Sequence, residues 1–245
     1  MKKIIIFTAL TLISGCKNLD TLQVTQQVMQ QLPSVMQQNT ALSQGDIATA
    51  LRQVLNNGVA NQVTKLTAVN GFYNNKLAKI MLPKELQMVS DTLHKVGLGS
   101  LAEKGTKALN RSAEEAVKTA TPIFVNAIQN IKFADAKNIL MGQDNAATQY
   151  LQNQTYNQLY RQFTPVIKQS FSKVGADSIW QNIITQYNNI PFVKKVNPDL
   201  NDYVAQQALK GVFTMIAQEE KGIRNNVGLR NTKLLQQVFS LQDYK

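Results

Sequence analysis

Apolar residues recur at intervals of three and four positions through nearly all of the chain after residue 42, and this spacing constrains the fold more than any other feature. The first apolar stripe consists of Ile47, Ala50, Leu51, Val54, Leu55, Val59 and Val63. Such spacing places apolar side chains on one face of an α-helix, whereas a half-buried strand alternates polar and apolar residues. No convincing strand pattern and no repeat of fixed period accompanies it. The sequence therefore predicts an all-α fold, a helical-bundle domain of eight to ten helices.

Turn and cap residues predict where several helices begin and end. Ser43 is expected to open the first helix, and Asp144 is expected to cap a long one. Thr121 followed by Pro122 predicts the start of a new helix, because proline suits the first helical position. Pro165 is expected to kink or split the long helix that contains it, because proline removes one backbone hydrogen bond.

The first 16 residues are arranged like the signal of an exported protein. Two lysines precede an apolar run over residues 4–13, and Ser14 and Gly15 stand before Cys16. This order is typical of a signal peptide, and the cysteine makes it resemble a bacterial lipoprotein signal. Residues 1–15 would then be removed, and Cys16 would become the lipid-modified N-terminus that holds the protein on a membrane. The alternatives are a transmembrane anchor, for which the apolar run is short of the roughly 20 residues needed, and a signal peptide with a chance cysteine.

The rest of the chain is expected to divide into a spacer and a folded part. Residues 16–42 are rich in glutamine and contain Pro33, which predicts a polar tether. Residues 43–245 are predicted to form the α-helical domain, in one piece or in two closely packed halves. The predicted location is the bacterial cell envelope, on the periplasmic side of a membrane. Lys17 stands where aspartate would resemble an inner-membrane retention signal, so the outer membrane is favoured over the inner.

The chain lacks the residues that most metal and acid–base sites use. It has one cysteine and one histidine, His94. The mature fold therefore has no second thiol for a disulfide or a thiolate metal site, and no histidine pair for a metal. No glycine-rich phosphate loop is present. The sequence predicts neither a metal nor a cofactor.

The charge is strongly basic but dispersed. The chain has 26 Lys and Arg against 15 Asp and Glu, and without the two lysines of the signal the net charge would be +9. No dense basic block and no ladder of aromatic and basic residues accompanies this charge, so nucleic acid is not a predicted partner. In the envelope the charge would favour anionic lipid, although ordinary surface charge accounts for it equally well.

Two pairs of neighbouring carboxylates suggest a catalytic alternative. They are Glu114 with Glu115, and Glu219 with Glu220. One glutamate from each pair, brought together from two helices, would supply the acid and base of a metal-independent hydrolase. Adjacent helical residues point about 100° apart, so only one member of each pair can face a given site. An arginine lies within about one turn of each pair, and intrahelical ion pairs account for most of the pattern.

Five short stretches resemble a bacterial family of envelope proteins whose domain has no assigned function. They are residues 110–115 (Asn-Arg-Ser-Ala-Glu-Glu), 133–142 (beginning Phe-Ala-Asp-Ala-Lys and ending Ile-Leu-Met-Gly), 146–150 (Ala-Ala-Thr-Gln-Tyr), 203–204 (Tyr-Val) and 219–224 (Glu-Glu-Lys-Gly-Ile-Arg). The resemblance spans about residues 45–240. It implies a shared α-helical fold and no particular reaction.

Polar residues, most of them from these stretches, are predicted to gather between the helices. The candidate members are Asn110, Arg111, Glu114, Glu115, Asp135, Asp144, Glu219, Glu220 and Arg224. Arg111 is expected to bridge to one of the nearby glutamates or to Glu220, and Arg224 is expected to pair with Asp135 or Asp144. Because buried charge pairs stabilise inefficiently, such a network would either fix the helix register or mark a specific site.

A second set of residues, all aromatic, is expected either to line an apolar pocket or to pack in the hydrophobic core. Its members are Tyr150, Tyr156, Tyr160, Phe163 and Phe213. As a pocket, they would open between helices and have Arg111 or Arg224 at a polar end. The sequence thus favours a membrane-tethered, non-catalytic protein that binds an amphipathic or anionic ligand or an envelope protein partner. The hydrolase is the alternative.

Overall fold

The structure is a computed structural model that describes residues 42–195 and 199–243. The chain divides into two units, Met1–Ala41 and Leu42–Lys245, of which only the second contains described residues. The predicted signal peptide, Cys16 and nearly all of the predicted tether lie outside them. The described residues form nine α-helices and no strand, which confirms the predicted all-α bundle of eight to ten helices.

Most of the described helices follow one another with short connections, and the two longest connections join α3 to α4 and α8 to α9. In chain order they are α2 (Gln44–Gly58), α3 (Thr64–Thr67), α4 (Lys84–Lys95), α5 (Gly99–Asn130), α6 (Ala136–Leu140), α7 (Ala146–Lys173), α8 (Ala176–Asn188), α9 (Asn201–Asn225) and α10 (Lys233–Ser240). A π-helical turn, η2 (Val59–Val63), joins α2 to α3, and a 3-10 turn, η3 (Val227–Leu229), precedes α10. Ser43 opens α2 as predicted, because its hydroxyl accepts from the backbone N–H of Asp46 while the Asp46 carboxylate accepts from the N–H of Ser43.

Helix α5 does not end where the sequence predicted a boundary. Pro122 lies inside the helix, which runs unbroken for 32 residues. Val117, Phe124 and Ile128 lie on one face of α5, and all three are buried. Because the apolar stripe continues across the proline, tertiary packing on both sides offsets the backbone hydrogen bond that Pro122 cannot donate.

Helix α7 likewise continues through Pro165, which does not split it. Phe163 and Ile167 flank this proline and are buried. The predicted cap of α7 is wrong, since the residue before the helix is Asn145 and no local side chain caps it. The free N–H groups at the start of α7 are satisfied from another helix, as described below.

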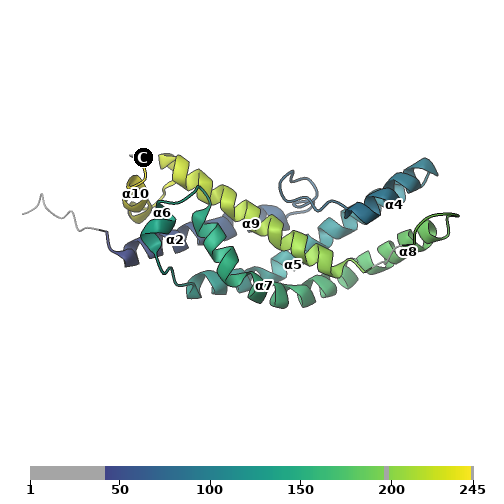
Figure 1. Ribbon diagram of the computed structural model, residues 1–245, viewed down its shortest axis with the longest axis horizontal. Helices are drawn as coiled ribbons and strands as arrows, with labels where there is room; N and C mark the ends of the chain where they lie inside the picture. Colours follow the sequence, from purple (N-terminus) through teal and green to yellow (C-terminus); the bar gives the residue numbers. More distant parts are fainter. Residues whose placement is uncertain (1–41, 196–198, 244–245) are drawn as a thin grey trace, which may run out of the picture. The chain divides into compact units, whose positions relative to one another are not determined.

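The long helices α5, α7 and α9 form the middle of the described unit (Figure 1). Helix α7 packs against both α5 and α9, and α2 packs against α9. Figure 1 shows α2, α6 and α10 at one end of this unit and α4 and α8 at the other. No helix among the described residues combines the length and apolar character needed to cross a membrane.

The core between these helices is closely packed. The Phe124 ring meets Phe163 and Phe213 edge to face, with ring centroids 6.2 and 6.1 Å apart. The Trp180 indole of α8 donates to the carbonyl of Gly105 on α5 at 3.1 Å. A methyl group added at Gly105 would lie 2.4 Å from Ile183, so only glycine lets α8 approach α5 this closely.

The loop after α8 contains an unusual backbone conformation. Among the described residues, two residues other than glycine have a positive φ: Asn70 at 60° and Phe192 at 68°. Asparagine tolerates this region, whereas a bulky side chain costs about 1–2 kcal/mol there. The Phe192 side chain is fully exposed, so this conformational cost is not offset by burial of the ring.

Candidate functional site

One face of α5 holds the segment that leads from α3 to α4. Asn110 is fully buried and exchanges two hydrogen bonds with the backbone of Ile80, accepting from its N–H at 2.8 Å and donating to its carbonyl at 2.9 Å. One turn further along, Glu114 accepts from the backbone N–H of Phe72 at 3.2 Å. These side chains fasten an irregular segment to a rigid helix, and that segment supplies one wall of a pocket.

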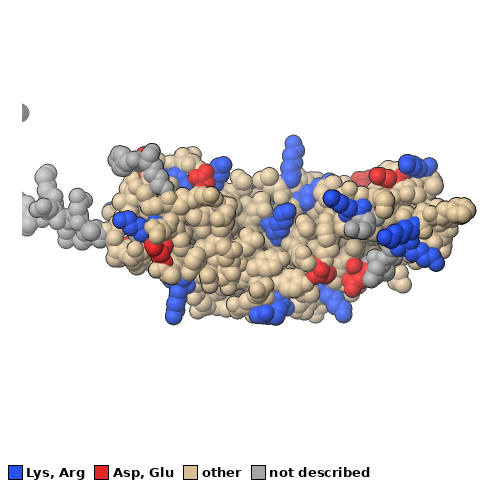
Figure 2. Space-filling view, viewed as in Figure 1, with Lys and Arg blue, Asp and Glu red and all other residues tan. Residues whose placement is uncertain are grey.

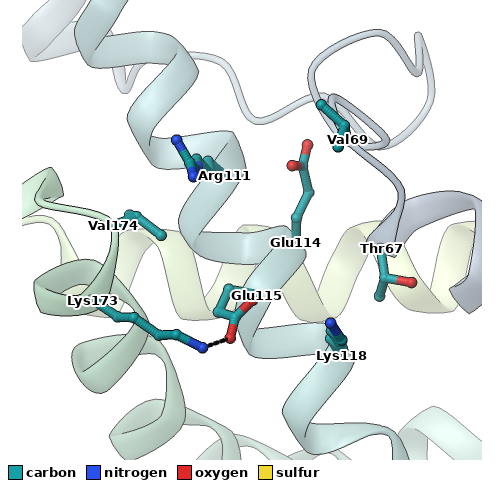
Figure 3. A pocket seen from close by; sticks show the side chains of 8 residues that line it. All are labelled: Thr67, Val69, Arg111, Glu114, Glu115, Lys118, Lys173 and Val174. Atoms are coloured by element: carbon teal, nitrogen blue, oxygen red, sulfur yellow. Dashed lines mark hydrogen bonds and ion pairs between the residues drawn. The ribbon is translucent and has the colours of Figure 1, made fainter.

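The pocket beside Glu114 has a volume of about 290 Å³ (Figure 3). It is lined by Thr67, Val69, Arg111, Glu114, Glu115, Lys118, Lys173 and Val174. Helix α5 supplies its charged floor, the end of α3 and the turn after it supply one wall, and the end of α7 supplies the other. The volume is near the lower end of ligand pockets, which begin at roughly 300 Å³.

The charges in the pocket do not cancel. Glu115 is paired with Lys173 (Figure 3), and this lysine holds the pKa of the Glu115 carboxyl below its usual value. Burial raises the pKa of Glu114, although backbone N–H groups of the 70–73 turn oppose the shift. Within the described residues, neither Arg111 nor Lys118 has a carboxylate oxygen within 4 Å. With both glutamates ionised, the three cations and two carboxylates give the pocket a net charge of +1, and Arg111 and Lys118 are the two cations without a close ion pair in that part of the chain.

A second polar cluster has a buried centre and connects the ends of three helices. The Glu220 carboxylate of α9 accepts from the backbone N–H groups of Ala147 and Thr148, at 2.9 and 2.7 Å, and from the Thr148 hydroxyl at 2.6 Å. Glu220 thus caps α7 from a distant part of the chain, where the helix dipole also favours a negative charge. Arg224 lies 2.8 Å from the same carboxylate, and both side chains are essentially inaccessible to solvent.

Arg224 and Arg230 use their remaining donors on helix C-termini. Arg224 donates to the carbonyls of Leu140 and Ile139 at the end of α6, at 2.6 and 3.2 Å. Arg230 donates to the carbonyls of Ile223 and Arg224 at the end of α9 and forms a two-pronged ion pair with Asp243. We name Glu220, Arg224, Arg230 and Asp243, with the backbone groups that they bind, the arginine cluster. All side-chain nitrogen atoms of its two arginines make contacts within the domain.

Residues 41–240 match the sequence family described as "Protein of unknown function (DUF4197)". The chain belongs to the DUF4197 family. No curated protein and no solved structure matches it. The family match covers α2 to α10, so the pocket and the arginine cluster, apart from Asp243, lie within the DUF4197 domain.

The stretches by which this chain resembles the family take part in contacts between elements of the DUF4197 domain. Asn110 binds Ile80, and the hydroxyl of Tyr203 donates to the carbonyl of Met81 at 2.7 Å. The remaining stretches meet in the arginine cluster, since they supply the end of α6, the start of α7 and the Glu220–Arg224 pair. Fold specification is therefore a sufficient physical reason for this pattern of residues.

The other members of the predicted polar network lie apart from one another. Asp135 caps α6 by accepting from the N–H of Asn138 at 3.0 Å. Asp144 lies on the surface, 3.9 Å from Lys221. Glu219 accepts from Asn61 and Gln62 at 2.8 and 2.6 Å. The predicted set is thus divided among α5, the arginine cluster and separate surface contacts, and the partner of Arg224 is Glu220.

The predicted aromatic set is also divided by the structure. Phe163 and Phe213 are buried around Phe124 in the core. Tyr156 and Tyr160 stack on each other with centroids 6.2 Å apart, and both are only partly buried. Tyr150 stacks on Phe133 and donates to the carbonyl of Lys132. None of the five lines the pocket beside Glu114.

Several residues of the two sites were not predicted. Lys118 lies seven positions after Arg111 on the same helix, so the periodicity alone would have placed both on one face. No local sequence pattern predicted the roles of Lys173, Arg230 and Asp243. Their contacts join residues far apart in the sequence or residues on either side of irregular turns. In the described residues, no group of His, Cys, Asp and Glu side chains is arranged to hold a metal ion.

Replacing Glu220 with glutamine should destabilise the domain strongly. The amide keeps the shape of the carboxylate but removes the charge that compensates buried Arg224, and it cannot accept from both backbone N–H groups as the two oxygens do. Breaking a buried pair typically costs about 3–5 kcal/mol, which urea denaturation would measure. Glu219→Gln is the matched control, since that side chain is partly exposed, and it should change the free energy of unfolding by far less. Equal losses in the two variants would contradict the assigned role of Glu220.

The two pocket glutamates should have opposite effects on the pH dependence of stability. The folded-state pKa of Glu114 is raised, so ionisation costs folded-state stability as pH rises past the ordinary carboxyl value. Glu114→Gln should therefore improve stability more at pH 7.5 than at pH 4. The pKa of Glu115 is lowered, so its contribution is present at neutral pH and lost on acidification. Glu115→Gln should reduce stability at pH 7.5 and have less effect at pH 3. Melting curves across this range would test both signs.

Proposed function

We propose that this protein is a lipid-tethered, non-catalytic binding domain of the bacterial cell envelope, and that its pocket beside α5 binds the negative headgroup of an amphiphile. The observation that carries the proposal is that Arg111 and Lys118 lie in a pocket of net positive charge and have no close ion pair in the part of the chain that the structure describes, so both can contact an anionic headgroup. Arginine suits this role because its planar guanidinium binds carboxylate or phosphate through two parallel hydrogen bonds.

The walls of the pocket suit the apolar part of such a ligand. Val69 is 90% exposed at the rim, and Val174 lines the opposite wall. An amphiphile whose headgroup contacts Arg111 and Lys118 would shield Val69 from water with its first methylene groups. The overall positive charge supports the same ligand class, because it raises the local concentration of anions.

The hydrolase alternative receives support from one observation. Glu114 and Glu115 line the same pocket, and their environments shift their pKa values in opposite directions, as in acid–base pairs of enzymes. The second pair of glutamates, however, is engaged elsewhere: Glu219 with Asn61 and Gln62, and Glu220 in the arginine cluster. The contacts of Glu114 with the 70–73 turn and of Glu115 with Lys173 account for both carboxylates without a reaction, so binding is the preferred function.

Removal of the two free cations should abolish ligand binding without unfolding the domain. Native mass spectrometry of protein extracted from its own membranes should show a bound anionic amphiphile on the wild-type protein and none on Arg111→Gln/Lys118→Gln. Losing two charge-assisted contacts should weaken affinity at least about tenfold. Lys104→Gln is the control for the loss of a charge on α5, because Lys104 is exposed and does not line the pocket.

Three results would count against this function. Wild-type protein without bound lipid and without a rise in melting temperature on addition of anionic amphiphiles would exclude the pocket. A co-purifying polypeptide displaced by Arg111→Gln/Lys118→Gln would make the partner a protein. Equal retention of lipid by the double variant and by Lys104→Gln would place the lipid elsewhere.

The membrane tether has a separate test. Cys16→Ser should prevent lipid attachment, so metabolic labelling with a radioactive fatty acid should label the wild-type protein only. The variant should also leave the membrane fraction or remain unprocessed at its signal peptide. A variant that is processed and stays in the membrane fraction, or a wild-type protein that takes up no label, would contradict the predicted lipoprotein.

A further inference from the structure

We propose that one end of the helical domain docks on the surface of an anionic phospholipid bilayer, with the Phe192 ring inserted among the headgroups. The docking end comprises the turn between α4 and α5, residues 95–98, and the loop after α8, residues 190–195. None of these residues lines the pocket beside Glu114, so this surface adds to the proposed binding function and does not depend on it.

The loop that exposes Phe192 is held in place by neighbouring residues that pack against the core. Ile190 and Val193, on either side of it, are partly buried against the core. Phe192 itself has a φ of 68° and a fully exposed side chain, with a relative exposure of 107%. The backbone is therefore held in a conformation that bulky residues avoid, while its neighbours pack inward. Such outliers persist where the surrounding structure enforces them, and they concentrate at functional sites.

Other apolar side chains are exposed at the same end. Val96 and Leu98 are 52% and 41% exposed, on either side of Gly97, whose φ of 80° makes the turn from α4 into α5. Helix α8 packs against both α4 and α5. Figure 1 shows the α4–α5 turn and the loop after α8 at the end of the domain opposite α2. Three apolar side chains thus project from one end.

The charge around these residues identifies the partner. Lys95, Lys194 and Lys195 are exposed, and none has a carboxylate oxygen within 4 Å in the described part of the chain. Asp91 lies one turn before Lys95 and is the nearest acidic residue in sequence on α4. Figure 2 shows basic side chains scattered over one face, and near the α4 and α8 end several of them lie with acidic side chains between them.

A bilayer accounts for this composition better than a protein partner does. Lysine is depleted from protein interfaces, whose centres form continuous apolar patches. Here single apolar side chains stand among lysines, which is the arrangement of membrane-interface anchors. Phenylalanine side chains of peripheral proteins bury at the boundary between headgroups and acyl chains, and nearby lysines are attracted to anionic lipid.

A tryptophan placed at the tip of the loop would test the proposal. Full-length Phe192→Trp protein would be mixed with vesicles of phosphatidylcholine alone or with added phosphatidylglycerol, each carrying brominated acyl chains as a quencher. The constant emission of buried Trp180 is subtracted with the wild-type protein. With phosphatidylglycerol, emission from position 192 should shift to shorter wavelength and be quenched at least twofold more than with phosphatidylcholine alone. Lys194→Gln/Lys195→Gln in the same background should remove most of that difference.

Val227→Trp is the matched control, because Val227 is 61% exposed in η3, between α9 and α10 at the other end of the domain. Equal quenching at positions 192 and 227, or quenching at 192 that does not depend on the anionic lipid, would overturn the proposal. Melting temperatures equal to that of wild type would show that the variants are folded. The same measurement on Arg111→Gln/Lys118→Gln should still show docking, so failure of the pocket and failure of the docking end are distinguishable.

Discussion

The hydrogen bonds between the Glu220 carboxylate and the start of α7 are the interaction on which the rest of the domain depends. A helix begins with backbone N–H groups that have no partner within the helix, and no local side chain serves those of α7. Glu220 satisfies two of them from α9, and Arg224 compensates its charge in a place that solvent does not reach. Arg224 then extends the contact to the end of α6. One carboxylate thereby fixes the relative positions of three helices.

Much of the architecture was predictable because it follows from periodicity. The stripes that begin with Ile47 and continue through α9 are long, and a helical period repeated many times leaves little room for another fold. The helix boundaries were less predictable at the prolines. Pro122 and Pro165 each disfavour a continuous helix, but the burial of Phe124 and Phe163 beside them overrides this preference. Helix-boundary rules based on local sequence do not include the energy of tertiary packing.

The candidate sites were predictable in their residue types but not in their pairings. The sequence indicated that Glu220 and Arg224 belong to a polar network, yet it could not show that backbone groups of α6 and α7 complete it. Those partners are 72 to 85 residues away along the chain. The pocket beside α5 could be predicted only in part, because Arg111 and Glu115 come from one helix whereas Val69 and Lys173 come from segments that only the tertiary fold brings to it. No sequence pattern predicted that the Phe192 ring would be exposed, because its exposure results from the packing of the neighbouring residues.

The cap on α7 also has a consequence for the order in which the domain can form. The backbone N–H groups of Ala147 and Thr148 are bound by the Glu220 carboxylate, which follows them by more than 70 residues in the sequence. A chain that emerges N-terminus first, from a ribosome or from a translocation pore, exposes α7 well before α9 exists outside. During that interval the earlier helices can form and pack loosely together, but they cannot reach their final arrangement without the contacts of Glu220. The domain should therefore remain incompletely folded until residue 220 emerges, so the same contact that stabilises the finished fold also delays its completion during synthesis.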